Sequence, residues 1–184
     1  MKKIVISAFM LFVIIVLGCV MFNSQTKADS THYLRIHIRA HSNGKADQTV
    51  KYKVRTAIVE YLAPYLADAT DKNKAQTIIS CHLARLSELA KSVLVANGFD
   101  YGASAKLNKE NFPTRSYDGF VLKRGVYDAL IIDLGDGRGD NWWCVVYPPL
   151  CFVNAESSNT GENSIQYVSK IKEIIENFKR KHSN

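Results

Sequence analysis

The segment YLRIHIRAH, residues 33–41, decides the fold because its side chains alternate between apolar and polar types. A repeat of two with branched apolar residues is typical of a β-strand that has one buried face. We therefore predict a strand that turns Arg35, His37 and Arg39 away from the core. The side chains on its apolar face are Leu34, Ile36, Ile38 and Ala40.

Two helical patterns follow this strand, and a third closes the chain. In the first, apolar residues recur at helical spacing over residues 50–65, and Pro64 should kink or end the helix because it lacks an N–H. The second helix should begin after Asp71 and end at Gly98, since glycine readily adopts the left-handed conformation of a helix end. The third pattern spans residues 164–181.

Between the second and third helices the repeat returns to two. We predict strands near residues 101–107, 120–122, 126–134 and 142–147, separated by glycine turns. Tight turns favour antiparallel pairing, whereas the first strand reaches the sheet across a long helical connection and could pair in parallel. The expected fold class is α/β in the broad sense and α+β more narrowly. We expect a small mixed, mostly antiparallel sheet of about four to five strands packed with three helices on one face.

The N-terminus has the order of an export signal. Two lysines precede nineteen uncharged residues, 4–22, and a polar stretch follows. Cleavage after Ala28 would fit, because small residues occupy the positions that a signal peptidase reads. Two alternatives stay open: residues 4–22 could remain as a membrane anchor, being near the roughly 20 needed to span a bilayer, or Cys19 could carry a lipid. Each route makes residues 29–184 a single extracytoplasmic domain, with membrane contact through residues 4–22 if they are retained.

The positive net charge of the chain does not indicate that it binds nucleic acid. The formal net charge is +7, and the two N-terminal lysines contribute two of those units. The densest basic run, residues 179–182, lies near the C-terminal end. A nucleic-acid binder usually combines a basic stripe with a recognisable module, and the sequence contains no such module. We expect a solvated basic surface and no nucleic-acid partner.

The expected extracytoplasmic location bears on the state of the cysteines. Outside the cytoplasm a close pair is more often a disulfide than a metal site, and Cys144 and Cys151 enclose a short loop with two prolines. In the chain-entropy model, closing a loop of about eight residues stabilises the fold by roughly 2.5 kcal/mol. Cys81 is left over, and we expect it to be an unpaired, half-buried thiol on a helix.

The sequence shows no catalytic or metal-binding constellation. Cys144 as a nucleophile would need a base within hydrogen-bond reach, and the sequence places neither His37 nor His41 beside it. A zinc site would need a third and a fourth ligand at known spacings. The segment DLGDGRGD, residues 133–140, lacks the alternating oxygen ligands of a calcium loop, so a turn between strands is expected. We therefore expect no catalytic residue, no metal and no cofactor.

The segment NWWCVVYPPL, residues 141–150, differs in kind from the other strands. In a strand Trp142 and Trp143 would point to opposite faces, so that one of them should pack in the core. The other, with the tyrosine and prolines that follow, could form a rigid apolar surface, since tryptophan and tyrosine are enriched at binding hot spots. Ordinary core packing of all these side chains is the alternative.

Several blocks of the sequence carry a resemblance to a known family. They are residues 34–55 (LRIHIRAHSN…DQTVKYKVR), residues 96–101 (ANGFDY) and residues 111–152, which end in NWWCVVYPPLCF. In this order they resemble the stage II sporulation protein R family of endospore-forming bacteria. The block from Trp-Trp-Cys to Pro-Pro-Leu-Cys is the most specific part. One departure is Ala-His-Ser-Asn at residues 40–43, where the family pattern has Ala-Asn-Ser-Asp, and it puts a role of His41 in doubt.

The resemblance implies a signalling protein rather than an enzyme. Family members are made in the forespore and exported into the space between the two septal membranes. There they trigger a membrane-embedded aspartic protease of the mother cell, at its extracytoplasmic face, and this protease cleaves the precursor of sigma factor E. The alternative is an extracytoplasmic thiol-dependent hydrolase that uses Cys144 with His37 or His41.

Two surfaces are candidates for contact with the protease. One is the aromatic-proline segment, which is the most constrained apolar part of the chain. The other is the polar face of the first strand, whose arginines could meet acidic groups. The residues concerned are Trp142, Trp143, Tyr147, Pro148 and Pro149 in the first surface, and Arg35 and Arg39 in the second.

Overall fold

The computed structural model describes residues 30–117, 120–152 and 162–182. The expected export signal, residues 1–28 with Cys19 and the apolar segment 4–22, lies outside these ranges. Among the helices within them, none is long and apolar enough to cross a membrane.

A four-stranded mixed sheet forms the centre of the molecule, in the order β2-β5-β1-β6. Strand β1 (Leu34–Arg39) runs parallel to β5 (Gly125–Leu134) and antiparallel to β6 (Asn141–Tyr147). Strand β2 (Ala103–Phe112) pairs antiparallel with β5 and forms one outer edge. The first strand therefore lies inside the sheet, with a neighbour on each side.

Two helices connect β1 to β2, and a third ends the described chain. They are α2 (Lys45–Leu66), α3 (Lys72–Ala96) and α4 (Glu162–His182). Helix α3 begins as predicted, because the carboxylate of its N-cap residue Asp71 accepts the backbone N–H of Lys74 at 2.9 Å. The chain leaves α3 through Gly98, whose φ of 81° suits glycine.

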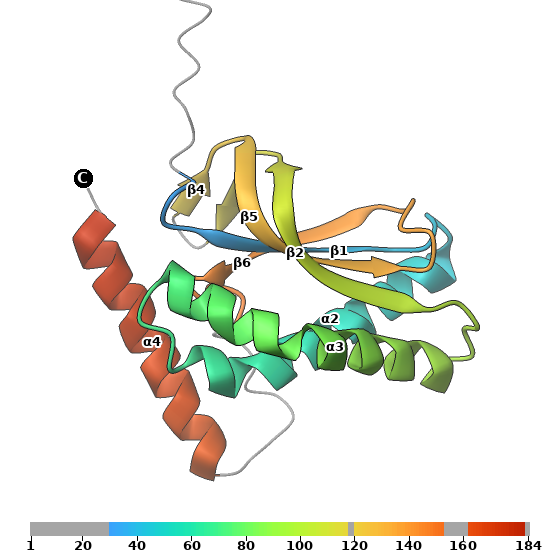
Figure 1. Cartoon of the computed structure of the whole chain (residues 1–184), viewed down its shortest axis with the longest axis horizontal. Coiled ribbons are helices and arrows are strands. Elements are labelled where there is room, and N and C mark those ends of the chain that lie inside the picture. Colours follow the sequence, from blue (N-terminus) through green and yellow to red (C-terminus); the bar gives the residue numbers. More distant parts are fainter. Residues whose placement is uncertain (1–29, 118–119, 153–161, 183–184) are drawn as a thin grey trace, which may run out of the picture.

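The main hydrophobic core lies between the sheet and the helices (Figure 1). Figure 1 shows α2 and α3 side by side beneath the sheet, with α4 at one end. The strands contribute mainly side chains of one parity, and α4 adds Ile171, Ile175 and Phe178 to the same cluster. Helices α2 and α3 thus cover one face of the sheet, and α4 joins the same core from one end.

The architecture confirms the predicted fold class, α+β with three helices and a mixed, mostly antiparallel sheet. The parallel contact of β1 with β5 is the one that the long helical connection suggested. A second, two-stranded sheet of β3 (Arg115–Tyr117) and β4 (Phe120–Leu122) adds to it. Strand β3 was not predicted from the sequence, because Arg-Ser-Tyr lacks the apolar residues that marked the equally short β4.

The prediction that β1 has only one buried face is wrong. Arg35 and His37 are as deeply buried as the leucine and isoleucines on the opposite face. The reason is that β1 is an inner strand and that a second, smaller core lies on its polar side. The main core covers one face of β1 and the smaller core covers the other, and the alternation of residue types does not reveal this second cover.

Candidate functional site

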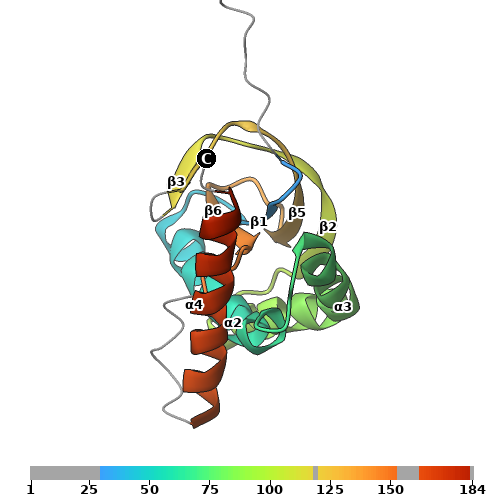
Figure 2. The same cartoon turned by 90° about the vertical axis from the view of Figure 1, so that its left-hand side faces the viewer.

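The face of the sheet opposite α2 and α3 carries the most concentrated polar chemistry of the described chain. We call it the helix-free face. In Figure 2 it points upward, toward β3, while α2 and α3 lie below the sheet. Its side chains come from every second residue of four strands, among them Arg35, His37, Arg39, Lys106, Glu110, Phe112, Tyr127, Ala129, Ile131, Asp133, Asn141 and Trp143.

An aromatic layer forms the floor of this face. Phe112 and Tyr127 are buried together with the aliphatic side chains between them, and Trp143 packs against this cluster. The rings of Phe112 and Trp143 meet edge to face, with centroids 4.8 Å apart. Edge-to-face pairs of this kind add to the free energy gained from burial alone.

Arg35 lies inside this layer rather than on the surface. Its guanidinium carbon is 4.1 Å from the centroid of the Phe112 ring, and its NH2 donates to the hydroxyl of Tyr117 at 2.8 Å. Burial lowers the pKa of Arg35, and the nearby Tyr117 partly offsets this effect. The cation is held by ring faces and one hydroxyl, because its Nε and NH1 have no hydrogen-bond partner among the described residues.

His37 is a second buried polar group of this layer. Its ring stacks on that of Trp143 with centroids 4.8 Å apart, and neither ring nitrogen has a hydrogen-bond partner in the described ranges. Burial, and next the charge of Arg39, lowers the pKa of His37 to about 4. The imidazole is therefore neutral at physiological pH, and its 4.0 Å approach to Glu110 is not an ion pair there.

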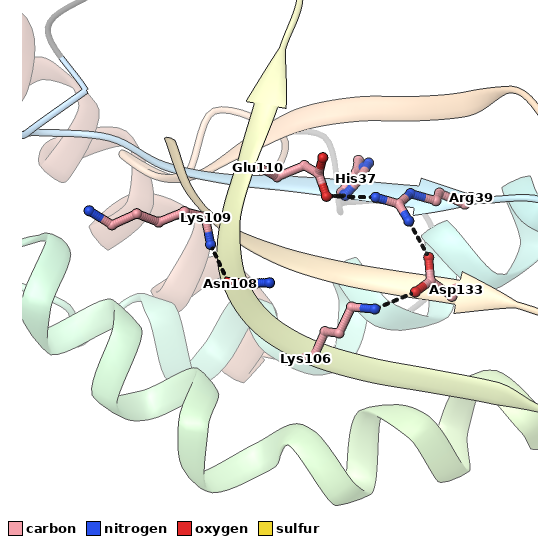
Figure 3. A network of polar contacts seen from close by, with 7 residues as sticks. All are labelled: His37, Arg39, Lys106, Asn108, Lys109, Glu110 and Asp133. Carbon is pink, nitrogen blue, oxygen red and sulfur yellow. Dashed lines mark hydrogen bonds and ion pairs between the residues drawn. The ribbon is translucent and has the colours of Figure 1, made fainter. Parts of the chain in front are cut away.

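Arg39 connects two carboxylates at the rim of the face (Figure 3). It bonds Glu110 of β2 at 2.6 Å and lies 3.4 Å from Asp133 of β5. Lys106 reaches the same aspartate at 2.9 Å. Arg39 and Glu110 keep about a quarter of their side-chain surface in contact with solvent, 26% and 29%, so this network is accessible to a partner.

The helix-free face has the features of a recognition surface. It presents charges of both signs, held in place by reciprocal contacts, beside a large ring that is half-buried. Rigid polar groups around an aromatic side chain are typical of the residues that dominate protein interfaces. Glu110 and Asp133 each lie against a cation, so the polar part of this face is a network of ion pairs.

The tryptophans point to opposite faces of β6, as predicted. Trp143 lies on the helix-free face beside His37, whereas Trp142 packs against the main core on the other side. The guanidinium of Arg55 lies 5.7 Å from the Trp142 ring. Both indoles are only half-buried, so each can still take part in a contact.

The rest of the aromatic-proline segment does not form an exposed surface, and that expectation is wrong. Tyr147, Pro148 and Pro149 are buried. Tyr147 packs with the main core and donates its hydroxyl to the carbonyl of Thr70 at 2.8 Å. Burial therefore gives these three residues a role in the fold, and Arg35 joins them for the same reason.

The cysteines are arranged in part as predicted. The structure pairs Cys144 with Cys151, with Cα atoms 6.3 Å apart, a separation that a disulfide can span. The oxidised state of the pair stays a prediction. Cys81 is unpaired, but it is exposed rather than half-buried, because it lies on the solvent side of α3.

The structure does not assemble the thiol–imidazole pair of the alternative hypothesis. Cys144 belongs to the core on the helix side of the sheet, and His37 lies on the opposite side. His41 lies beyond the end of β1, where its ring stacks on Tyr101 and its Nδ1 accepts the backbone N–H of Asp136 at 3.0 Å. The sheet itself thus separates Cys144 from His37.

The segment DLGDGRGD forms a turn between β5 and β6, as predicted. This turn is bonded to the loop that follows β1. The backbone N–H of Gly139 donates to the carbonyl of Ala40 at 2.9 Å, and that of Asp140 donates to the side chain of Asn43 at 2.6 Å. Two of the blocks that carry the family resemblance therefore meet at this end of the sheet.

A cleft of about 630 Å³ lies between α4 and the loop from α2 to α3. Its charged lining residues have both signs, among them Lys170, Glu173 and Asp71. The cleft shares no lining residue with the helix-free face, and its mixed charges select no particular class of ligand.

Sequence reasoning missed Glu110, Phe112, Tyr117 and Asp133 as members of this site. Glu110, Phe112 and Asp133 come to β1 only through pairing across the sheet, and Tyr117 comes from the separate β3–β4 sheet. A charged residue in a strand pattern is the one signal that could have found Glu110 and Asp133, because it marks the solvent-facing parity of the strand.

Comparison with known proteins gives one family. The family model for stage II sporulation protein R matches residues 30–157. A curated relative, stage II sporulation protein R of Bacillus subtilis (strain 168), is 31% identical over 151 residues, which cover 80% of this chain and 67% of the relative. No solved structure matches the chain.

Proposed function

Because the chain belongs to the stage II sporulation protein R family, we propose that it is an exported sporulation signal. It leaves the forespore and acts in the space between the two septal membranes. There it triggers a membrane-embedded aspartic protease of the mother cell, which cleaves the precursor of sigma factor E. The observation that carries this proposal is the family match, which spans the whole sheet together with α2 and α3.

The arrangement of basic and uncharged residues at the N-terminus supports the proposed location outside the cytoplasm. Two lysines and nineteen uncharged residues precede the matched region, in the arrangement of an export signal. The pairing of Cys144 with Cys151 suits an oxidising compartment. If residues 4–22 are retained, they hold the domain at the forespore membrane, where it faces the mother-cell membrane that carries the protease.

The helix-free face is the surface that we assign to the protease. Arg39 and Glu110 are accessible there, and Trp143 offers a half-buried ring beside them. Such a contact triggers the protease only if it is tighter for the active state than for the inactive state, since a ligand shifts an equilibrium by its difference in affinity. Trp142, next to Arg55, is a second point of contact at the edge of the same strand.

An immunoblot of the sigma factor E precursor tests the proposal. The host is a sporulating strain that lacks its own signal protein and is complemented with this chain, with and without residues 1–28. We expect cleavage only with the exportable version. If neither version restores cleavage, the cognate protease is supplied as well, and a second failure with folded protein outside the cell would reject the proposed function.

A further inference from the structure

The two outer edges of the sheet differ in their backbone hydrogen bonds. On β2, the N–H of Ala105 donates to Ser87 Oγ at 2.9 Å, and the N–H of Lys109 donates to the side chain of Asn108 at 2.8 Å. These contacts occupy donors that would otherwise be free to pair with another strand. Native proteins commonly protect exposed edges in such ways.

On β6, only the second half of the edge is protected in this way within the described ranges. The N–H of Val145 donates to Cys151 Sγ at 3.3 Å, so it points away from β1. Backbone groups alternate in direction along a strand, and therefore Asn141 and Trp143 also turn their N–H and C=O outward. Strand β6 pairs with β1 alone, and no other described segment bonds these outward groups.

The side chains of the same two residues are also incompletely bonded. Asn141 Oδ1 is buried and has no hydrogen-bond partner among the described residues. The indole N–H of Trp143 can only donate, and it reaches no acceptor in this part of the chain. Both side chains lie on the helix-free face, opposite Arg39 and His37 of β1.

A two-fold axis through Trp142 would bring these unpaired groups together. In an antiparallel pairing centred on Trp142, each Asn141 lies opposite Trp143 of the second copy, and such a pair exchanges two backbone hydrogen bonds. The indole N–H of Trp143 then faces the Asn141 side chain of the second copy, whose amide turns outward from its buried position to accept the hydrogen bond. On the other face Trp142 meets Trp142 of the second copy, and aromatic pairs of this kind stabilise antiparallel strands.

We propose that this chain forms a homodimer in which residues 141–143 of β6 pair antiparallel with the same residues of a second copy. The two four-stranded sheets then form one continuous sheet, and the two helix-free faces become a single surface. A symmetric contact satisfies the same unpaired groups on both copies with one surface. The contact between Val145 and Cys151 ends the pairing and so fixes its register. The proposal is independent of the proposed function.

The molecular mass of the exported chain tests the proposal. It is measured by light scattering after size-exclusion chromatography over a wide range of concentration, in detergent if the anchor is retained. The variant Asn141→Pro removes one outward N–H and the unpaired amide, and it breaks no hydrogen bond to β1, since proline is tolerated at the first residue of a strand. The matched control is Asn111→Pro, which makes the same change on the outer edge of β2.

We expect twice the chain mass for the wild type and for Asn111→Pro, and the mass of one chain for Asn141→Pro with an unchanged circular dichroism spectrum. If the wild type has the mass of a single chain at every concentration, the proposal is overturned, even if another molecule binds the outer edge of β6. The proposal is also overturned if Asn141→Pro forms a dimer with the same dissociation constant as the wild type. If Asn141→Pro does not fold, Asn141→Ala replaces it: a several-fold weaker dimer is expected, and an unchanged dissociation constant overturns the proposal.

Discussion

Arg35 donates a 2.8 Å hydrogen bond to the hydroxyl of Tyr117, which lies 82 positions further along the chain. Through this bond an inner strand of the sheet holds the small β3–β4 sheet against the helix-free face. The guanidinium is also stacked near the rings of Phe112 and Tyr127, at 4.1 and 4.9 Å from their centroids. A buried arginine thus takes the place of an apolar core residue at this point.

Replacing Arg35 by methionine should loosen the β3–β4 sheet. The hydrogen bond and the cation–π contacts are lost and the Tyr117 hydroxyl is left unpaired, at a cost of about 1–3 kcal/mol in the free energy of unfolding. Hydrogen exchange should become faster in residues 115–117 and 120–122 before it changes in β1. The control is Arg85→Met on the exposed side of α3, and unchanged exchange in β3 and β4 would contradict this role of Arg35.

Two glycine substitutions should differ sharply in their effect on stability. A Cβ on Gly139 would overlap the backbone carbonyl of Ser42, whereas a Cβ on Gly102 meets nothing within 4 Å. Gly139→Ala should therefore lower the free energy of unfolding by about 1–3 kcal/mol, and Gly102→Ala should change it by less than about 1 kcal/mol. Urea denaturation measures both, and equal stability of the two variants would show that the contact between the two loops is not rigid.

Stability should fall as the pH is lowered from about 6.5 to about 4, in part because of His37. Its pKa drops from 6.5 in the unfolded chain to about 4 in the fold, so the unfolded state binds a proton in this window that the folded state does not. The contribution is present above the unfolded pKa, is lost progressively down to the folded pKa, and amounts to roughly 3 kcal/mol at most. Urea denaturation at several pH values should show a flatter dependence for His37→Phe than for the wild type, and identical slopes would contradict the burial of a neutral imidazole.

The cysteine pair should be oxidised in the exported chain. Under non-reducing conditions, alkylation of the unfolded domain should label Cys81 and leave Cys144 and Cys151 unmodified. Cys151→Ala should lower the free energy of unfolding by roughly 2–3 kcal/mol, the value for closing a short loop. Labelling of all three cysteines in freshly exported protein would contradict the disulfide.

Charge reversal at Arg39 should abolish signalling while the domain stays folded. Arg39→Glu removes the link between Glu110 and Asp133 and places a third carboxylate beside them, so the free energy of unfolding should fall by about 1–3 kcal/mol without unfolding the domain. Processing of the sigma factor E precursor should be lost at an unchanged level of exported protein. The matched control, Arg85→Glu on the exposed side of α3, should process normally, and normal processing by Arg39→Glu would remove the helix-free face from the proposed contact.

Much of the fold was accessible from local patterns in the sequence. The start of α3 at Asp71, its end at Gly98 and the long strands β5 and β6 all lie where periodicity and glycine or capping residues predicted them. These features depend on residues that are close together in the chain. Strand β3 escaped prediction because its three residues gain their structure from pairing with β4.

The candidate site was only partly accessible in this way. Arg35 and Arg39 were both predicted on the polar face of the first strand, but only Arg39 is accessible. The sequence did not show which tryptophan would lie on the helix-free face, and it left surface exposure and core packing open for Tyr147, Pro148 and Pro149, which are buried. The sequence gives the alternation of a strand, but the burial of each face depends on which elements cover it. Neither Glu110 nor Asp133 could be assigned to the site before the order of the strands was known.

The sequence by itself determined most of the secondary structure, the α+β class, the resemblance to a sporulation family and the opposite orientation of the two tryptophans. Only the tertiary structure decided that β1 is an inner strand, so that an apparently exposed row of polar residues became the buried floor of the candidate site. The physical reason is the separation of the interacting residues along the chain. Helix and strand preferences arise from neighbours a few residues apart. Burial, the lowered pKa of His37 and the Arg39 network instead arise from strands that the chain brings together from distant positions.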